Sequence, residues 1–154
     1  IKGYTDGSFQ PNKSITRAEL ATIIARFAKL DVNTKTFSDI NGHWAQKNIE
    51  LAAGNGWING YEDGTYKPTK AISRQEMAKV LYGYDKIGGK TADGITEKLT
   101  YTDVDAIGEW ALESVTYCTA AGYLAGSNGA FNPKGTATRA MGAKVLMNMT
   151  KEAA

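Results

Sequence analysis

The sequence is poor in the residues that most often carry chemistry. It has one cysteine, Cys118, and one histidine, His43, among 154 residues. A single cysteine excludes an intrachain disulfide, and His43 has no metal-ligating partner at the spacing of a zinc site. No Ser-His-Asp or Cys-His arrangement and no phosphate-binding glycine loop can be assembled. The sequence therefore predicts no catalytic centre, no metal site and no cofactor, and we expect the chain not to be an enzyme.

Charge of one sign and long apolar runs are also scarce. Eighteen basic and 16 acidic residues leave a net charge of +2, so no nucleic-acid partner is expected and any recognition of anions must be local. No apolar run approaches the ~18 residues of a membrane-spanning helix, and no signal peptide is recognised, so we expect no membrane insertion. The chain opens on Ile1 rather than on methionine, which favours a piece of a longer polypeptide.

Glycine is abundant, with 17 residues, and much of it lies in a segment that recurs. A turn-rich loop is followed each time by a hydroxyl residue and an arginine at the start of a helical pattern. Recognising such a repeat decides the fold class. The loops are Gly3–Pro11, Gly60–Pro68 and Gly126–Pro133, and the helix starts are Thr16-Arg17, Ser73-Arg74 and Thr138-Arg139.

The apolar residues after each arginine follow the spacing of an amphipathic helix. The inner positions of the second helices are Leu20, Ile23, Ile24 and Phe27, then Met77, Val80, Leu81 and Tyr84, then Val145, Leu146 and Met149. Leading helices are predicted with Ala45, Ile49 and Ala52, and with Val115 and Cys118, on their inner faces. Short helices are marginal alone, so we predict an all-α fold of tandem helix-loop-helix repeats packed as a pseudo-threefold helical bundle.

The alignment of the copies sets the predicted domain organisation. Ile1 aligns with Ile58, so the counterpart of 37–57 is absent ahead of the first loop. We predict the second half of repeat one at 1–30, repeat two at 36–86, a linker at 87–99 and repeat three at 100–152. The region 85–100 holds two glycine turns among charged residues and is predicted to be a flexible linker, and 30–35 is predicted to be a short polar connection.

Two residues of each helix start have a structural explanation. Thr16 with Glu19, and Ser73 with Glu76, have the spacing of a capping box, in which side chain and backbone satisfy each other. Loss of such a cap typically costs ~1 kcal/mol. The third copy has Met141 where the others have glutamate, so half of its box is missing.

The arginine between them is not explained by capping. A cation in the first turn of a helix opposes the helix dipole, at a cost of roughly 0.3–1 kcal/mol. An anion nearby would reverse that effect, because helix N–H groups and a guanidinium fork together suit a carboxylate or phosphate. The alternative is an internal ion pair, for which the candidate partners are Asp6, Asp39, Asp63 and Asp103. The sequence leaves both explanations open.

Several motifs resemble the S-layer homology repeat: Phe37-x-Asp39-x-x-x-His43-Trp44-Ala45, the loop Gly60–Pro68, and Ile15–Glu19. The resemblance covers nearly the whole chain apart from 85–100. It implies three repeats arranged as a pseudo-trimer of helices in extracellular proteins of the bacterial cell wall or S-layer. It also implies non-covalent anchoring to cell-wall polysaccharide, often a secondary polymer that ends in pyruvylated N-acetylmannosamine.

The resemblance further implies that the arginines contact the acidic sugar in grooves between adjacent repeats. That role falls to Arg17, Arg74 and Arg139, and because repeat two is the complete copy we predict Arg74 to contribute most and Arg139 least. The remaining predicted ligand-binding residues are Tyr4, Asp6, Asp39, Trp44, Tyr61 and Asp63. The alternative function is a structural module that self-associates through its incomplete first repeat. An enzyme acting on wall glycan is disfavoured because no catalytic constellation is present.

Overall fold

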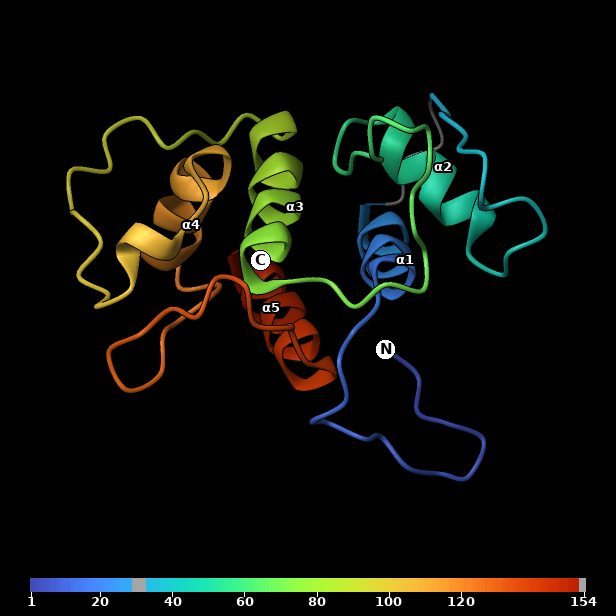
Figure 1. Ribbon diagram of the computed structural model, residues 1–154, viewed down its shortest axis with the longest axis horizontal. Coiled ribbons are helices and arrows are strands. Elements are labelled where there is room, and N and C mark those ends of the chain that lie inside the picture. Colours follow the sequence, from blue (N-terminus) through green and yellow to red (C-terminus); the bar gives the residue numbers. More distant parts are fainter. Residues whose placement is uncertain (29–32, 153–154) are drawn as a thin grey trace.

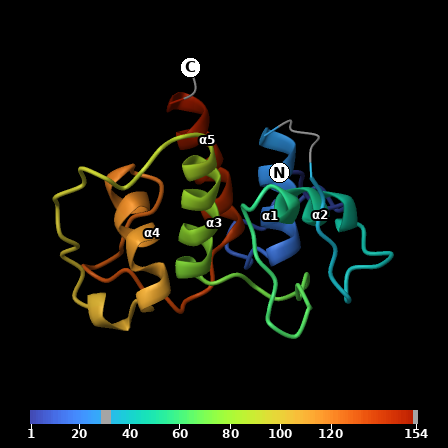
Figure 2. The ribbon, with the colours of Figure 1, turned by 90° about the horizontal axis from the view of Figure 1, so that it is seen from above.

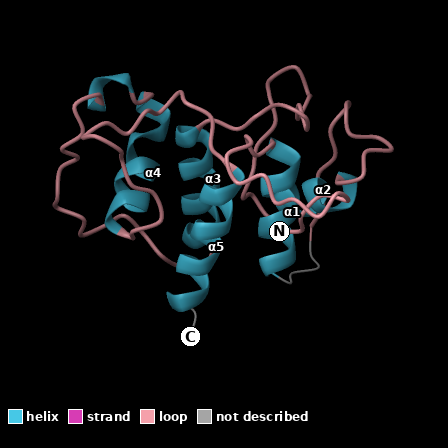
Figure 3. Ribbon diagram, turned by 90° about the horizontal axis from the view of Figure 1, so that it is seen from below, coloured by secondary structure: helices cyan, strands magenta, loops and turns pink. Residues whose placement is uncertain are grey.

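The computed structural model describes residues 1–28 and 33–152, and within them helices and loops make up the chain (Figures 1 and 3). The elements in order are α1 (Arg17–Ala28), α2 (Gln46–Gly54), α3 (Arg74–Ile87), a short 3-10 helix η1 (Val104–Ala106), α4 (Glu109–Ala120) and α5 (Arg139–Glu152). The described part forms no strand, so the all-α prediction is confirmed. None of its helices has the length and apolar character needed to cross a bilayer. The predicted connection at 30–35 lies partly outside the described residues.

The predicted inner faces form the core. Leu20 and Ile24 of α1 are buried, as are Met77 and Leu81 of α3. In the leading helices Ile49 and Ala52 of α2 and Cys118 of α4 have no exposed surface, and neither has Ala45 just before α2. Burying these stripes stabilises helices that are too short to be stable alone. The helical periodicity of the sequence therefore located the core.

The helix starts have the predicted caps. Thr16 Oγ1 accepts from the Glu19 amide at 3.1 Å, and the Thr16 amide donates to Glu19 Oε2 at 2.9 Å. Ser73 and Glu76 form the same pair of bonds at 3.2 and 3.1 Å. In the third copy the Met141 sulfur lies 3.5 Å from the amide of the capping threonine, where the other copies have a carboxylate.

The helices pair across repeat boundaries. Helix α2 packs against α1, and α4 packs against α3 (Figures 1 and 2). Each of these second helices is thus covered by the leading helix of the following repeat, not by the leading helix of its own. Among the described residues no helix covers α5 to a comparable extent.

The segments just ahead of the second helices meet in a closed ring of backbone hydrogen bonds. The Ile15 amide donates to Ala137 O at 2.9 Å, the Ala137 amide to Ile72 O at 2.9 Å, and the Ile72 amide to Ile15 O at 3.0 Å. The ring gives each repeat the same relation to the next. It supports the pseudo-threefold arrangement, which for the helices as whole bodies stays a prediction.

The segment predicted as a flexible linker is held at its start. Asp85 lies inside α3, and its buried carboxylate accepts from the hydroxyls of Tyr117 and Tyr123, both at 2.7 Å. Lys90 Nζ contacts the same oxygen at 3.3 Å, and the Ala92 amide donates to a tyrosine hydroxyl of α3 at 3.1 Å. These contacts join the segment to α3 and α4. The repeat and linker boundaries stay predictions.

Candidate functional site

Each arginine of the repeated helix start reaches into the loop of another repeat. Its Nε and Nη2 atoms donate to two backbone carbonyls of that loop at 2.7–3.1 Å, and its side chain is almost completely buried. The acceptors are Tyr66 and Asn59 for Arg17, Phe131 and Ala125 for Arg74, and Phe9 and Lys2 for Arg139. Two edges of the fork therefore tie repeats together, and only Nη1 faces outward.

Three cavities lie where an arginine meets the loop of another repeat, and we call them grooves A, B and C. Groove A has a volume of about 550 Å³, and its lining includes Arg139, Lys2, Tyr4, Glu19 and Trp44. Groove B has a volume of about 240 Å³, and its lining includes Arg17, Tyr61, Glu76, Lys79 and Trp110. Groove C has a volume of about 650 Å³, and its lining includes Arg74, Asn128, Met141 and Lys144.

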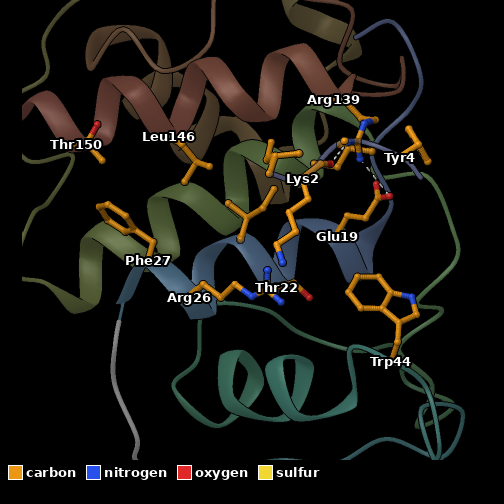
Figure 4. Close-up of a pocket in the computed structure, with 14 residues that line it drawn as sticks. Lys2, Tyr4, Glu19, Thr22, Arg26, Phe27, Trp44, Arg139, Leu146 and Thr150 are labelled. Atoms are coloured by element: carbon orange, nitrogen blue, oxygen red, sulfur yellow. Dashed lines mark hydrogen bonds and ion pairs between the residues drawn. The ribbon is translucent and has the colours of Figure 1, made fainter. Parts of the chain in front are cut away.

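Groove A combines an ion pair with aromatic surface. Arg139 Nη1 lies 3.5 Å from Glu19 Oε1, and its guanidinium lies 4.7 Å from the centre of the Tyr4 ring. The Tyr4 hydroxyl is buried without a hydrogen-bond partner. Figure 4 shows these three side chains gathered at one end of the cavity, with Trp44 near them and Leu146 at the other end.

Groove B has the same parts in a narrower space. Arg17 Nη1 lies 3.9 Å from Glu76 Oε2, and Lys70 Nζ lies 3.6 Å from the other oxygen of that carboxylate. Lys70 also donates to the Tyr61 hydroxyl at 3.0 Å, and that bond raises the pKa of Lys70 above its ordinary value. Trp110 is half exposed at the rim, with Lys79 Nζ 5.2 Å from its ring centre. The guanidinium of Arg17 is thus paired with a carboxylate.

Groove C differs because it has no carboxylate among its lining residues. Arg74 Nη1 contacts Met141 Sδ at 3.3 Å, where the other grooves hold a glutamate. Burial lowers the pKa of Arg74, but an arginine stays protonated in proteins. The exposed amine of Lys144 adds a second positive charge. Groove C therefore has no carboxylate in its lining to pair with Arg74, and the nearest charge to a counter-ion is that of Asp103 behind the loop, which reduces the effect of burial on the pKa of Arg74.

The predicted acidic residues do not join the arginines. Asp39 accepts from the amides of Tyr66 and Lys67, both at 2.8 Å, and so positions the loop of repeat two. Asp63 accepts within its own loop from the side chain and amide of the threonine two residues on, which lowers its pKa. Asp6 has the same turn with Ser8, whose amide and hydroxyl lower the pKa of Asp6. None of these aspartates lines a groove.

The structure brings other predicted residues to the grooves and adds some that the sequence reasoning missed. Tyr4, Tyr61 and Trp44 line grooves, each near an arginine. Trp110 was missed, although its place before a buried alanine matches that of Trp44 and could have been read from the repeat. Lys144 had no such signal. No group of three or more potential metal ligands occurs within the described residues.

Comparison with known proteins identifies the repeats. The family model described as S-layer homology domain matches residues 1–21, 36–78 and 100–140, which is more than half of the chain. The chain is similar to cell surface glycoprotein 1 of Acetivibrio thermocellus, 37% identical over 148 residues that cover 87% of this chain and 6% of the relative.

Two further relatives match most of the chain. A cellulosome-anchoring protein of Acetivibrio thermocellus is 35% identical over 91% of this chain and 33% of its own length. The S-layer protein sap of Bacillus anthracis is 28% identical over 99% of this chain and 19% of its own length. The chain thus spans about a third or less of these relatives. It belongs to the S-layer homology domain family, whose members are non-catalytic, extracellular modules associated with the cell wall.

Proposed function

We propose that the chain anchors a surface protein to the bacterial envelope by binding an acidic cell-wall polysaccharide non-covalently, with a pyruvylated N-acetylmannosamine type of polymer as ligand. A relative that is named a cellulosome-anchoring protein supports the anchoring role. The observation that carries the choice of an acidic ligand is Arg74 in groove C, which faces a thioether and a lysine instead of a carboxylate.

The free edge of Arg74 suits a ligand carboxylate. A thioether is a weak acceptor, so replacing Met141 Sδ by a carboxylate oxygen would exchange a weak contact for a charge-assisted hydrogen bond. Helix α5 begins beside this groove, and Lys144 lies one turn further along it. The ketal carboxylate of a pyruvylated sugar carries the charge that Arg74 and Lys144 would favour.

The glutamates of grooves A and B oppose the same use. At an effective dielectric constant of 20, two unit charges 4 Å apart interact by about 4 kcal/mol. A ligand carboxylate beside Arg17 would gain an attraction of that order, but it would be repelled by Glu76, which lies 3.9 Å from the guanidinium and is itself partly neutralised by Lys70 at 3.6 Å. We therefore assign the carboxylate end of the ligand to groove C.

Grooves A and B suit uncharged sugar rings. Trp44 and Trp110 are exposed at their rims and Tyr4 and Tyr61 line their walls, so each groove offers aromatic faces on two sides. The apolar face of a pyranose can pack on such rings, because aromatic side chains offer a large flat apolar surface. One polymer could in this way engage several grooves.

Sedimentation with purified cell walls tests the proposal. The chain should pellet with intact walls and remain in solution when the secondary polymer has been removed by acid. A pyruvylated monosaccharide should compete, while the same sugar without its pyruvate should compete poorly. Equal retention on stripped walls would contradict polysaccharide anchoring.

Self-association is the second candidate function, and the exposed face of α5 favours it. Met147 on that face is 59% exposed, unusual for an apolar side chain on a packed helix. A molar mass that rises with concentration in light scattering would support this candidate. A constant monomer mass would count against it.

A further inference from the structure

Met141 stands where a glutamate faces two donors in the other repeats. Glu19 Oε2 accepts from the amide of its own cap residue at 2.9 Å, and Glu19 Oε1 lies 3.5 Å from Arg139 Nη1. In repeat three a single sulfur takes both places, because Met141 Sδ lies 3.5 Å from the Thr138 amide nitrogen and 3.3 Å from Arg74 Nη1. A thioether is a weak acceptor. Two good donors therefore converge on one poor acceptor.

This sulfur belongs to a residue that can be reached from groove C. Met141 lines the groove and is only partly buried. Met77 and Met149 are buried in the core, and burial raises the pKa of the Cys118 thiol, which keeps it protonated and unreactive. Met147 is 59% exposed but lines none of the three grooves. Of these sulfur-containing residues, Met141 alone combines accessibility with a place in a groove.

We propose that Met141 is a modification site, and that its oxidation to the sulfoxide occupies the outward edge of Arg74. The oxidant is a peroxide. The sulfur lone pair attacks one peroxide oxygen, so that a sulfur–oxygen bond forms and the oxygen–oxygen bond breaks. The proton of the transferred oxygen passes to the leaving hydroxyl, which departs as water. The sulfur is oxidised and the peroxide is reduced.

The sulfoxide supplies the acceptor that this position lacks. Its oxygen is attached to a sulfur that already lies within 3.5 Å of both donor nitrogens. A hydrogen bond from the charged guanidinium of Arg74 to that oxygen is charge-assisted and stronger than the thioether contact. The Thr138 amide would gain the acceptor that completes a capping box in the other repeats. Oxidation of a methionine usually disrupts packing, because a polar group enters apolar surroundings, whereas at Met141 the new oxygen meets two donors.

The consequence for ligand binding rests on the proposed function. A ligand carboxylate and the sulfoxide oxygen would compete for Arg74 Nη1, because the other two nitrogens of the fork already donate to the carbonyls of Phe131 and Ala125. Lys144 keeps its charge in the same groove, so affinity should fall without being abolished. Grooves A and B have no sulfur in their linings. Oxidation would therefore act on groove C and leave the other two unchanged.

Hydrogen peroxide treatment of a Met147→Leu chain tests the modification. This variant removes the exposed methionine that would otherwise dominate the reaction. Digestion and mass spectrometry follow Met141, with the buried Met77 and Met149 as references within the same chain. We expect Met141 to oxidise several-fold faster than either reference. We also expect the Thr138 amide proton, observed by NMR, to move downfield on oxidation because its acceptor becomes stronger.

Met141→Leu in the same background is the matched control, because leucine keeps an apolar side chain without the sulfur. Peroxide should leave the Thr138 amide shift of this control unchanged. In the chain that retains Met141, the melting temperature should stay level or rise on oxidation. A Met141 rate equal to that of the buried methionines would overturn the proposal. So would a falling melting temperature with no shift of the Thr138 amide, since the sulfoxide would then only disturb packing.

Calorimetry with a pyruvylated N-acetylmannosamine monosaccharide distinguishes the modification from the proposed function. Oxidation should weaken binding several-fold in the chain with Met141 and leave the affinity of the Met141→Leu control unchanged. Equal affinity before and after oxidation of Met141 would overturn the occupation of Arg74 by the sulfoxide. Absence of binding in both states would contradict the proposed function, and the Met141 rate and the Thr138 shift would then decide the modification by themselves.

Discussion

Grooves B and C both pair an arginine with a lysine of the next helix, and the position that changes the charge beside the arginine is a glutamate in groove B and a methionine in groove C. Both place an arginine fork on two loop carbonyls and leave Nη1 facing outward. In groove B that edge faces Glu76, and in groove C it faces Met141. The comparison teaches that the capping glutamate has two roles: it starts its own helix, and it compensates the arginine of the preceding repeat.

The loss of half a capping box in repeat three therefore also removes a carboxylate from beside Arg74. Within its own repeat, Met141 in place of glutamate removes half of a capping box and so costs part of the ~1 kcal/mol that a cap contributes to helix stability. Judged across the boundary, it frees one edge of Arg74. If groove C binds anions because of this exchange, changes at Arg74, Met141 and Glu76 should alter binding in different directions.

Arg74→Ala should have the largest effect, on both stability and binding. Two loop carbonyls, of Phe131 and Ala125, would lose their donors, and an unsatisfied buried polar group costs about 1–3 kcal/mol. We expect a loss of about 2–4 kcal/mol in the free energy of unfolding and loss of wall binding. Urea unfolding and sedimentation with walls measure the two effects.

Lys144→Ala is the matched control, because Lys144 lines the same groove but is exposed and has no carbonyl to hold. It should weaken wall binding several-fold and leave the unfolding midpoint unchanged. Full binding by this variant would mean that Lys144 does not contact the ligand.

Met141→Glu should come next and move binding and stability in opposite directions. The new carboxylate would complete the capping box, for a gain of up to ~1 kcal/mol. It would also compensate Arg74 as Glu76 compensates Arg17. We expect wall affinity to fall by about tenfold, which corresponds to ~1.4 kcal/mol, while the melting temperature stays level or rises. Unchanged affinity with a raised melting temperature would remove groove C as the carboxylate site.

Glu76→Met is the reciprocal change and should have a smaller effect. It converts groove B to the composition of groove C, so Arg17 would lose the carboxylate at 3.9 Å. The loss of half the box at Ser73 should cost up to ~1 kcal/mol. Affinity for a pyruvylated sugar, measured by calorimetry, should rise a few-fold, with the sugar lacking pyruvate as the control. A fall for both sugars would show that Glu76 is needed for groove shape.

The sequence predicted much of this comparison but not its geometry. Helical periodicity and the Thr16–Glu19 box follow from local interactions, and both are confirmed. Which loop an arginine enters is decided by tertiary packing. The sequence predicts the largest contribution from Arg74 because repeat two is complete. In the structure Arg74 instead contacts the loop of repeat three, and the loop of repeat two contacts Arg17. No local pattern carries this exchange between repeats.

The sequence left two explanations for the arginines, an external anion or an internal ion pair with an aspartate, and the structure shows a third. An aspartate partner was considered, but in grooves A and B the carboxylates facing the guanidinium are Glu19 and Glu76, contributed by other repeats than the arginines they face. The aspartates hold loop backbone instead, as Asp39 does. Capping alone explains why Glu19 and Glu76 are present, so the sequence gives no indication that they also face an arginine of another repeat.

The smallest expected effect concerns Asp103, which holds the loop of groove C as Asp39 holds that of groove B. Its carboxylate accepts from the amides of Phe131 and Asn132, and these bonds lower its pKa below the ordinary 3.8. A carboxyl group with a depressed pKa in the folded state stabilises above its unfolded value and loses that contribution as pH falls through the folded value. Asp103→Asn should therefore lower the melting temperature slightly at neutral pH.

That difference should shrink once the pH falls below 3.8 and vanish when the carboxylate of the wild-type chain is protonated. Melting curves of both chains from neutral pH to about pH 2 make the comparison, and an exposed lysine variant such as Lys134→Ala serves as a control for net charge. Curves that stay parallel over the whole range would mean that the loop is held by its other contacts. Melting temperatures that converge at low pH would mean that ionised Asp103 holds the loop in which the Phe131 carbonyl accepts from Arg74. The stability of the fold in acid would then depend on the same loop that positions Arg74 in groove C.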